Sequence, residues 1–69
     1  MRALTDRQGE VLRFITSHFA AHGWAPTVRE IADAFGFAST NAATDHLEAL
    51  QRKGAIRVGN GKARAIRVL

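Results

Sequence analysis

Two helix-start signatures, each followed one helix length later by a glycine, divide the first half of the chain. In this capping box, a threonine hydroxyl and a side chain three residues later each accept a free backbone N–H. The two pairs are Thr5 with Gln8 and Thr27 with Glu30. Gly23 and Gly36 provide the left-handed residue that commonly follows a helix. We therefore expect helices over about residues 6–22 and 28–35, and Pro26 excludes a continuous helix between them.

Apolar residues recur at helical spacing in both segments, so each helix is expected to bury one face. The apolar face of the first helix is expected to comprise Val11, Leu12, Ile15 and Phe19. The corresponding face of the second comprises Val28, Ile31, Ala32 and Phe35. Gly9 is a local misfit, because glycine costs about 1 kcal/mol relative to alanine in a helix interior.

A third helix is expected over about residues 40–53, with Ser39 as its cap and Gly54 at its end. The residues at i, i+4 and i+7 that should face the core are Ala43, Leu47 and Leu50. The opposite face comprises Asn41, Thr44, Asp45 and Glu48. The start of this helix is thus built from short polar side chains, where surface helices usually carry glutamate and lysine.

The last segment, about residues 55–69, has the pattern of a β-hairpin. Asn60-Gly61 is the strongest short hairpin signal, because both residues tolerate positive φ. On either side of it, apolar residues alternate with Arg57 and Arg67. The hairpin is therefore expected to bury its apolar side on the helices and to expose these arginines.

The order of these elements defines the expected fold class. Two helices joined by a glycine-containing turn form a helix-turn-helix, and a basic hairpin directly after the second of them forms a wing. We expect a mainly α fold with a small antiparallel β-hairpin, that is, a winged helix-turn-helix of three helices and a two-stranded wing. With 69 residues, of which 46% are hydrophobic, residues 1–69 are expected to form a single domain with a thin core. The chain has no cysteine, so no disulfide can brace it.

Basic residues are concentrated at the C-terminal end of the sequence. Residues 1–48 contain four arginines and six carboxylates, whereas residues 49–69 contain six basic residues and no acid. This asymmetry favours a polyanionic partner. A solvated charged tail and an anionic membrane surface are the alternatives, although alternating apolar and basic residues suit a strand better than an interfacial helix. No apolar run approaches the ~18 residues that span a bilayer, and the N-terminus lacks the apolar region of a signal peptide, so we expect a cytoplasmic location.

In a helix-turn-helix, the second helix enters the DNA major groove with its N-terminal end first. Short residues there let the backbone approach the base edges: asparagine pairs with adenine, serine and threonine hydrogen-bond to several bases, an alanine methyl contacts thymine, and a carboxylate accepts from cytosine. The expected base contacts are Ser39, Asn41, Ala42, Thr44 and Asp45. The expected phosphate contacts are Arg7, Arg52, Lys53, Lys62 and Arg64.

Metal binding and catalysis find little support in the sequence. His18 and His22 have the i, i+4 spacing of metal ligands, but His46 is the only other histidine and no third ligand is evident. No nucleophile, base and orienting group can be assembled either. We therefore expect no enzyme activity, no cofactor and no metal. Trp24 is expected to pack over the open end of the core, with stacking on a base as the alternative.

Four blocks of the sequence, ALTDRQGEVLRFI, PTVREIADAFGF, STNAATDHLEALQRKGAI and ARAIRVL, cover most of the chain. They resemble the N-terminal DNA-binding domain of the LexA repressor family, which governs the bacterial SOS response. The resemblance implies a winged helix-turn-helix that represses DNA-damage genes by binding operators upstream of them. It also implies that Ser39, Asn41 and Ala42 read the operator and that the wing lies near the phosphates.

The sequence departs from the family pattern in the third helix. Thr44 stands where an acidic residue is frequent and Thr40 where proline is common, so the preferred bases are expected to differ from those of well-known relatives. Family members continue into a self-cleaving domain that carries a Ser-Lys dyad and dimerises, whereas this chain stops at Leu69. We therefore expect no protease activity and either an excised domain or a standalone relative. Alone it should be a monomer, and two copies are expected to pair on palindromic half-sites of DNA or through the C-terminal domain of the longer family members.

A winged-helix domain that binds an acidic protein partner is the rival interpretation of the same pattern. A helix that docks on protein should present aromatic or aliphatic anchors. The outer face of the third helix presents none, because Asn41, Thr44 and Asp45 are all polar. This feature favours DNA.

Overall fold

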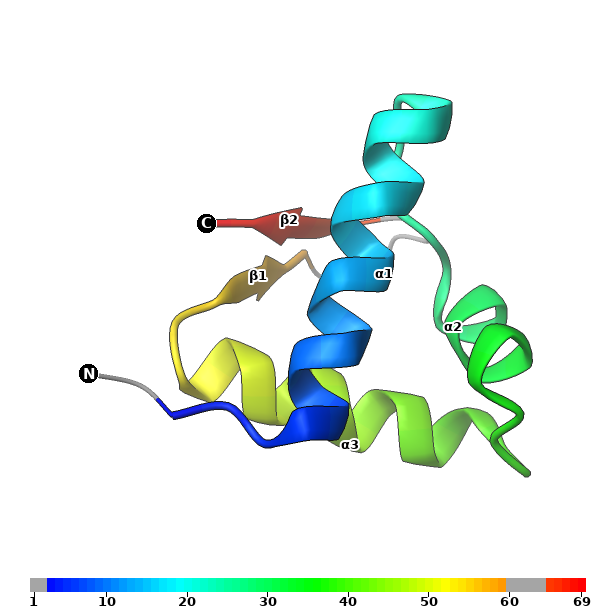
Figure 1. Cartoon of the computed structure of the whole chain (residues 1–69), viewed down its shortest axis with the longest axis vertical. Coiled ribbons are helices and arrows are strands. Elements are labelled where there is room, and N and C mark those ends of the chain that lie inside the picture. The colour runs from blue at the N-terminus through cyan, green and yellow to red at the C-terminus, as the bar shows by residue number, and fades with distance from the viewer. Residues whose placement is uncertain (1–2, 60–64) are drawn as a thin grey trace.

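Three helices and a two-stranded sheet occupy the part of the chain that the computed structural model describes, residues 3–59 and 65–69 (Figure 1). The elements are α1 (Asp6–His22), α2 (Val28–Phe35), α3 (Thr40–Arg52), β1 (Ile56–Val58) and β2 (Ile66–Val68). This is the mainly helical architecture with a small antiparallel hairpin that the sequence predicts. Within the same residues, no helix is both long and apolar enough to cross a membrane.

Both capping boxes that the sequence predicts are formed. The Thr5 hydroxyl accepts the Gln8 N–H at 3.1 Å, and the Gln8 side chain accepts the Thr5 N–H at the same distance. At the start of α2, the Thr27 hydroxyl accepts the Glu30 N–H at 3.0 Å, and the Glu30 carboxylate accepts the Thr27 N–H at 2.8 Å. These reciprocal bonds satisfy donors that have no partner within the helix, so they fix where α1 and α2 begin.

The end of α3 differs slightly from the sequence expectation. The helix ends at Arg52, one residue early, and Lys53 is its C-cap. Gly54 follows with a φ of 78°, in the left-handed region. The Ala55 N–H then bonds back to the Leu50 carbonyl at 2.9 Å, as in a Schellman motif, which directs the chain from the helix into β1.

The three helices and the sheet share one apolar core within the described residues. Its most deeply buried side chains are Val11, Ile15, Ile31, Ala43, Leu50 and Ile56. In Figure 1, α3 crosses the lower part of α1, and it packs against α1, α2 and β1. Leu12, Val28 and Phe35 lie at the margin of the core. Phe19, which the helical spacing placed in the core, is instead 55% exposed, because the elements around it leave an open groove.

The sheet consists of β1 and β2 paired in an antiparallel register, in which the partners are Ile56 with Val68, Arg57 with Arg67 and Val58 with Ile66. Ile56 and Ile66 bury their side chains against the helices, whereas Arg57 and Arg67 are exposed on the opposite face, as the sequence predicts. The Asn60-Gly61 turn expected between the strands lies outside the described residues.

Candidate nucleic-acid interface

One face of α3 is buried and the other is open to solvent. Ala43, Leu47 and Leu50 point into the core, as their spacing predicts. Asn41 and Asp45 are exposed, while Ala42 and Thr44 are half-buried along the flanks of the open face. The five residues expected to contact bases therefore lie at the N-terminal end of one helix, with Ser39 directly before it.

The side chains at this end of α3 are not engaged by the protein. Within the described residues, Ser39, Asn41 and Asp45 form no side-chain hydrogen bond or ion pair. Ser39 occupies the N-cap position, but its hydroxyl makes no capping bond, contrary to expectation. Its φ of −149° differs from the −68° and −81° of the two threonine caps, so its side chain is directed differently. No acidic residue lies in the first turn, so the positive end of the helix dipole is left uncompensated.

The turn that positions α3 contains the left-handed Gly36, with a φ of 69°. The Phe37 N–H bonds to the Ala32 carbonyl at 2.9 Å and the Gly36 N–H to the Asp33 carbonyl at 3.3 Å. These two bonds form a Schellman motif. They close α2, and the chain turns over residues 36–39 before α3 begins and packs against α2 in a helix-turn-helix.

A chain of ring contacts supports this turn and was not predicted from the sequence. Phe37 stacks between Phe35 at 5.6 Å and His46 at 5.5 Å, measured between ring centroids. Phe14 of α1 meets the edge of Phe35 at 5.7 Å. Because His46 belongs to α3, the rings connect α1, the turn and α3. The only sequence signal was the aromatic pair that flanks Gly36, and it did not identify the partners.

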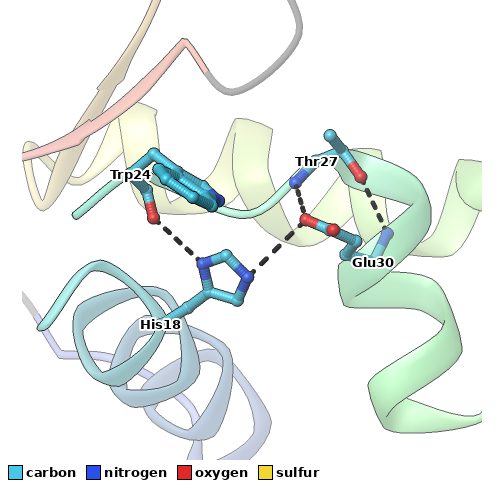
Figure 2. A network of polar contacts seen from close by, with 4 residues as sticks. All are labelled: His18, Trp24, Thr27 and Glu30. Atoms are coloured by element: carbon cyan, nitrogen blue, oxygen red, sulfur yellow. Dashed lines mark hydrogen bonds and ion pairs between the residues drawn. The ribbon is translucent and has the colours of Figure 1, made fainter. Parts of the chain in front are cut away.

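A polar network joins α1 to the start of α2 (Figure 2). His18 Nδ1 lies 3.0 Å from the Trp24 carbonyl oxygen, to which it can only donate. His18 Nε2 lies 3.7 Å from the Glu30 carboxylate, which also completes the capping box of α2. The His18 side chain is only 12% exposed, so this histidine holds the first helix of the helix-turn-helix in place.

The remaining histidines and Trp24 lie beside this network. The His22 ring is 4.3 Å from the His18 ring and stacks on Trp24 at 5.9 Å. Among the described residues, no three His, Asp or Glu side chains come together in a group that could hold a metal. Trp24 does not close the core as expected, because half of its surface remains exposed along a groove.

The expected phosphate contacts differ in how far the protein engages them. Arg7 forms an ion pair with Glu10 at 3.2 Å, and its guanidinium lies 5.6 Å above the centre of the Phe35 ring. Lys53 donates to the Ala3 carbonyl at 2.8 Å and to Gln8 at 2.7 Å, which leaves one of its three N–H donors. Arg52 is exposed. Lys62 and Arg64 lie outside the described residues.

The sheet presents two basic residues that are not among the phosphate contacts expected from the sequence. Arg57 and Arg67 are register partners, so two cations stand directly opposite each other on the exposed face. Like charges in this position are destabilising unless an anion lies nearby. The alternation of the sequence predicted their common face, but only the register shows that they are neighbours.

A helix-turn-helix that presents small polar residues at the start of its second helix, followed by a two-stranded sheet with exposed arginines, defines a winged helix DNA-binding domain. The family model described as the LexA DNA binding domain matches residues 1–65. The chain belongs to this family.

Proteins named LexA repressor are similar to the chain along most of its length. Those of Anaeromyxobacter dehalogenans strains 2CP-1 and 2CP-C and of Anaeromyxobacter sp. strain K are each 53% identical over 66 residues. The aligned region covers 96% of this chain but 29% of each relative. The chain thus spans less than a third of the length of each relative, and residues 1–65 match the DNA-binding domain of the family.

Proposed function

We propose that the chain binds double-stranded DNA in a sequence-specific manner, with the N-terminal end of α3 in the major groove. The observation that supports this most directly is the unengaged start of α3, where exposed Ser39, Asn41 and Asp45 have no partner within the described protein. Protein-docking helices bury apolar anchors, and this face has none. An uncapped helix start beside phosphates is also electrostatically favourable.

The proposed base contacts are Ser39, Asn41, Ala42, Thr44 and Asp45. The amide of Asn41 suits the N6 and N7 positions of adenine, and the carboxylate of Asp45 suits N4 of cytosine. Ala42 offers a methyl group to thymine. Ser39 and Thr44 have hydroxyl groups that donate or accept, so they suit several bases.

The proposed phosphate contacts are Arg7, Arg52, Lys53, Lys62 and Arg64. The guanidinium of Arg7 lies over the Phe35 ring, and two internal hydrogen bonds of the Lys53 ammonium leave it one donor for a phosphate. Each phosphate neutralised by such a contact contributes about −0.9 to the slope of log K against log salt.

We further propose that the domain serves a transcriptional repressor of DNA-damage genes in the SOS response, acting in the bacterial cytoplasm on the nucleoid. The similarity to proteins named LexA repressor supports this assignment. By itself the domain would be a monomer that occupies one half-site. Two copies on a palindrome would bind more tightly, because joining two modules raises the effective concentration of the second.

Selection of bound sites from a random duplex pool, followed by affinity measurement, tests the base contacts. Asn41→Ala should weaken binding to the selected site by about 1–3 kcal/mol. The difference in affinity between the selected site and random duplex should therefore become smaller. Ser17→Ala is a matched control, because Ser17 is also an exposed polar residue on a helix but lies on α1. Equal losses on selected and random duplex for Asn41→Ala would contradict base readout by α3.

The salt dependence of binding tests the phosphate contacts separately. Lys62→Ala should weaken binding to both duplexes alike and reduce the salt slope by about 0.9. An unchanged slope would remove Lys62 from the interface.

A further inference from the structure

An apolar groove lies beside β2 and involves no residue of α3. It has a volume of about 570 Å³ and is bounded by the C-terminal half of α1, the connection to α2 and residues 65–68. Phe19 and Trp24 line it and are 55% and 50% exposed. In Figure 1 the C-terminal end of α1 is at the top, and α3 is at the bottom. A ligand in this groove would therefore leave the start of α3 free.

The register of the sheet shows which backbone groups of β2 point away from β1, at the edge of the strand that lines this groove. The Gly59 N–H bonds to the Ala65 carbonyl and the Leu69 N–H to the Ala55 carbonyl, both at 3.0 Å. In an antiparallel pair, hydrogen-bonded residues alternate with residues whose N–H and C=O point outward. The outward residues of β2 are therefore Ile66 and Val68. Within the described residues, no hydrogen bond to their N–H groups is present.

The outer edge of β1 is protected in a way that the edge of β2 is not. The outward Val58 N–H donates to the side-chain oxygen of Gln51 in α3 at 2.9 Å. Sheet edges are usually covered or charged, because open edges pair with other strands. The edge of β2, by contrast, lies open along an apolar groove.

The charges along the groove indicate the chemistry of an occupant. Arg67 is the one charged residue in the described lining, and no carboxylate is present there. The whole segment 49–69 also lacks acidic residues. A second copy added edge to edge would place basic strands side by side, which is unfavourable. An acidic occupant gains from the same charges.

We propose that the groove binds an extended segment of a partner protein in which acidic and apolar residues alternate, added as a third strand to β2. Successive side chains of a strand point to opposite faces. The apolar residues of the segment would pack on Phe19 and Trp24, and its acidic residues would lie beside Arg67. Main-chain bonds to Ile66 and Val68 supply the strand pairing. The domain thereby binds a protein partner and DNA through separate surfaces.

Two capped peptides test this proposal by NMR titration of the 69-residue chain. In one, glutamate alternates with valine and isoleucine, and in the other the same residues are arranged as an acidic block and an apolar block. The alternating peptide should shift the amides of Ile66 and Val68 and slow their hydrogen exchange. The amide of Val58, which is already bonded to Gln51, serves as an internal control and should not gain protection.

Matched variants distinguish binding in the groove from attraction of the peptide to basic charge in general. Arg67→Gln should weaken binding of the alternating peptide by about threefold to fivefold. Arg57 lies on the same face of the sheet but outside the groove, so Arg57→Gln should change the affinity by less than about twofold. Phe19→Ala should weaken binding of the alternating peptide by about fivefold or more. The domain should remain folded, because more than half of Phe19 is exposed.

Three results would overturn the proposal. Equal binding of the block peptide would show simple charge attraction, and shifts confined to Asn41–Glu48 would place the peptide on α3. Sedimentation of the chain as a dimer, with the same amides of β2 protected, would assign the edge to a second copy. Asn41→Ala should retain full affinity for the alternating peptide, so failure of the DNA proposal is distinguishable from failure of this one.

Discussion

Replacing Gly36 with alanine tests whether the left-handed turn before α3 stabilises the fold. Gly36 has a φ of 69°, and a Cβ built at this position would meet no atom within 4 Å. Steric contact with neighbours is therefore not the issue, and the backbone conformation alone decides the result. An L-residue in the left-handed region loses about 1–2 kcal/mol.

The net magnitude also includes the unfolded chain. Alanine restricts the unfolded state more than glycine does, which returns about 0.4–1 kcal/mol. We therefore expect Gly36→Ala to lower the free energy of unfolding by about 1 kcal/mol. For a domain of this size, that corresponds to a fall in Tm of about 4–8 °C.

Gly9→Ala is the matched control, because the same chemical change should have the opposite sign. Gly9 lies within α1, and its added Cβ would meet the end of the Arg13 side chain at an ordinary 3.7 Å. The higher helix propensity of alanine should raise the free energy of unfolding by about 1 kcal/mol. Urea denaturation followed by circular dichroism measures both variants. If both changes shift stability in the same direction, the conformational argument is wrong.

Four further substitutions test the packing, the caps and the charge at the helix start. Phe37→Ala should lower the free energy of unfolding by about 1.5–3 kcal/mol, because Phe37 is half-buried between Phe35 and His46. Urea denaturation measures this change, and a loss below about 0.5 kcal/mol would show that the stacked rings do not stabilise the turn. Thr5→Ala and Thr27→Ala should each lose about 1 kcal/mol in the same assay, and no loss would mean that the capping boxes do not stabilise the helices. Ser39→Asp should stabilise the domain by about 0.3–1 kcal/mol, because its carboxylate would be attracted to the positive end of the helix dipole, yet it should weaken DNA binding; tighter binding would argue against phosphate near that helix end.

Features that depend on neighbours in sequence could be predicted, whereas features that depend on distant neighbours could not. Each capping box joins residues three positions apart, so the pattern contains both partners. The bonds from Lys53 to Ala3 and Gln8 span 50 and 45 positions, and no local pattern indicates them. Helical spacing predicted that Phe19 lies on the apolar face of α1, but it could not show that the described elements leave 55% of this residue exposed.

The candidate site shows the same division. The exposure of Asn41 and Asp45 follows from the burial of Leu47 and Leu50 on the opposite face, and the periodicity of α3 contains both facts. The absence of a capping bond from the Ser39 hydroxyl could not be predicted in the same way, because capping requires a particular backbone conformation as well as a suitable residue. The opposition of Arg57 and Arg67 likewise depends on a strand register that composition does not fix.

The three described helices differ in whether side chains cap the free N–H groups at their N-terminal ends, and the uncapped helix is the one proposed to bind DNA. α1 and α2 each begin with a complete capping box, whereas α3 begins without a capping bond and without an acidic residue in its first turn. A cap on α3 would stabilise the domain, but it would occupy the N–H groups and hydroxyl that the proposed DNA contact uses. Functional sites commonly sacrifice stability in this way. The contacts that hold this end of α3 are instead the Schellman motif at Gly36 and the stacked rings of Phe37 and His46.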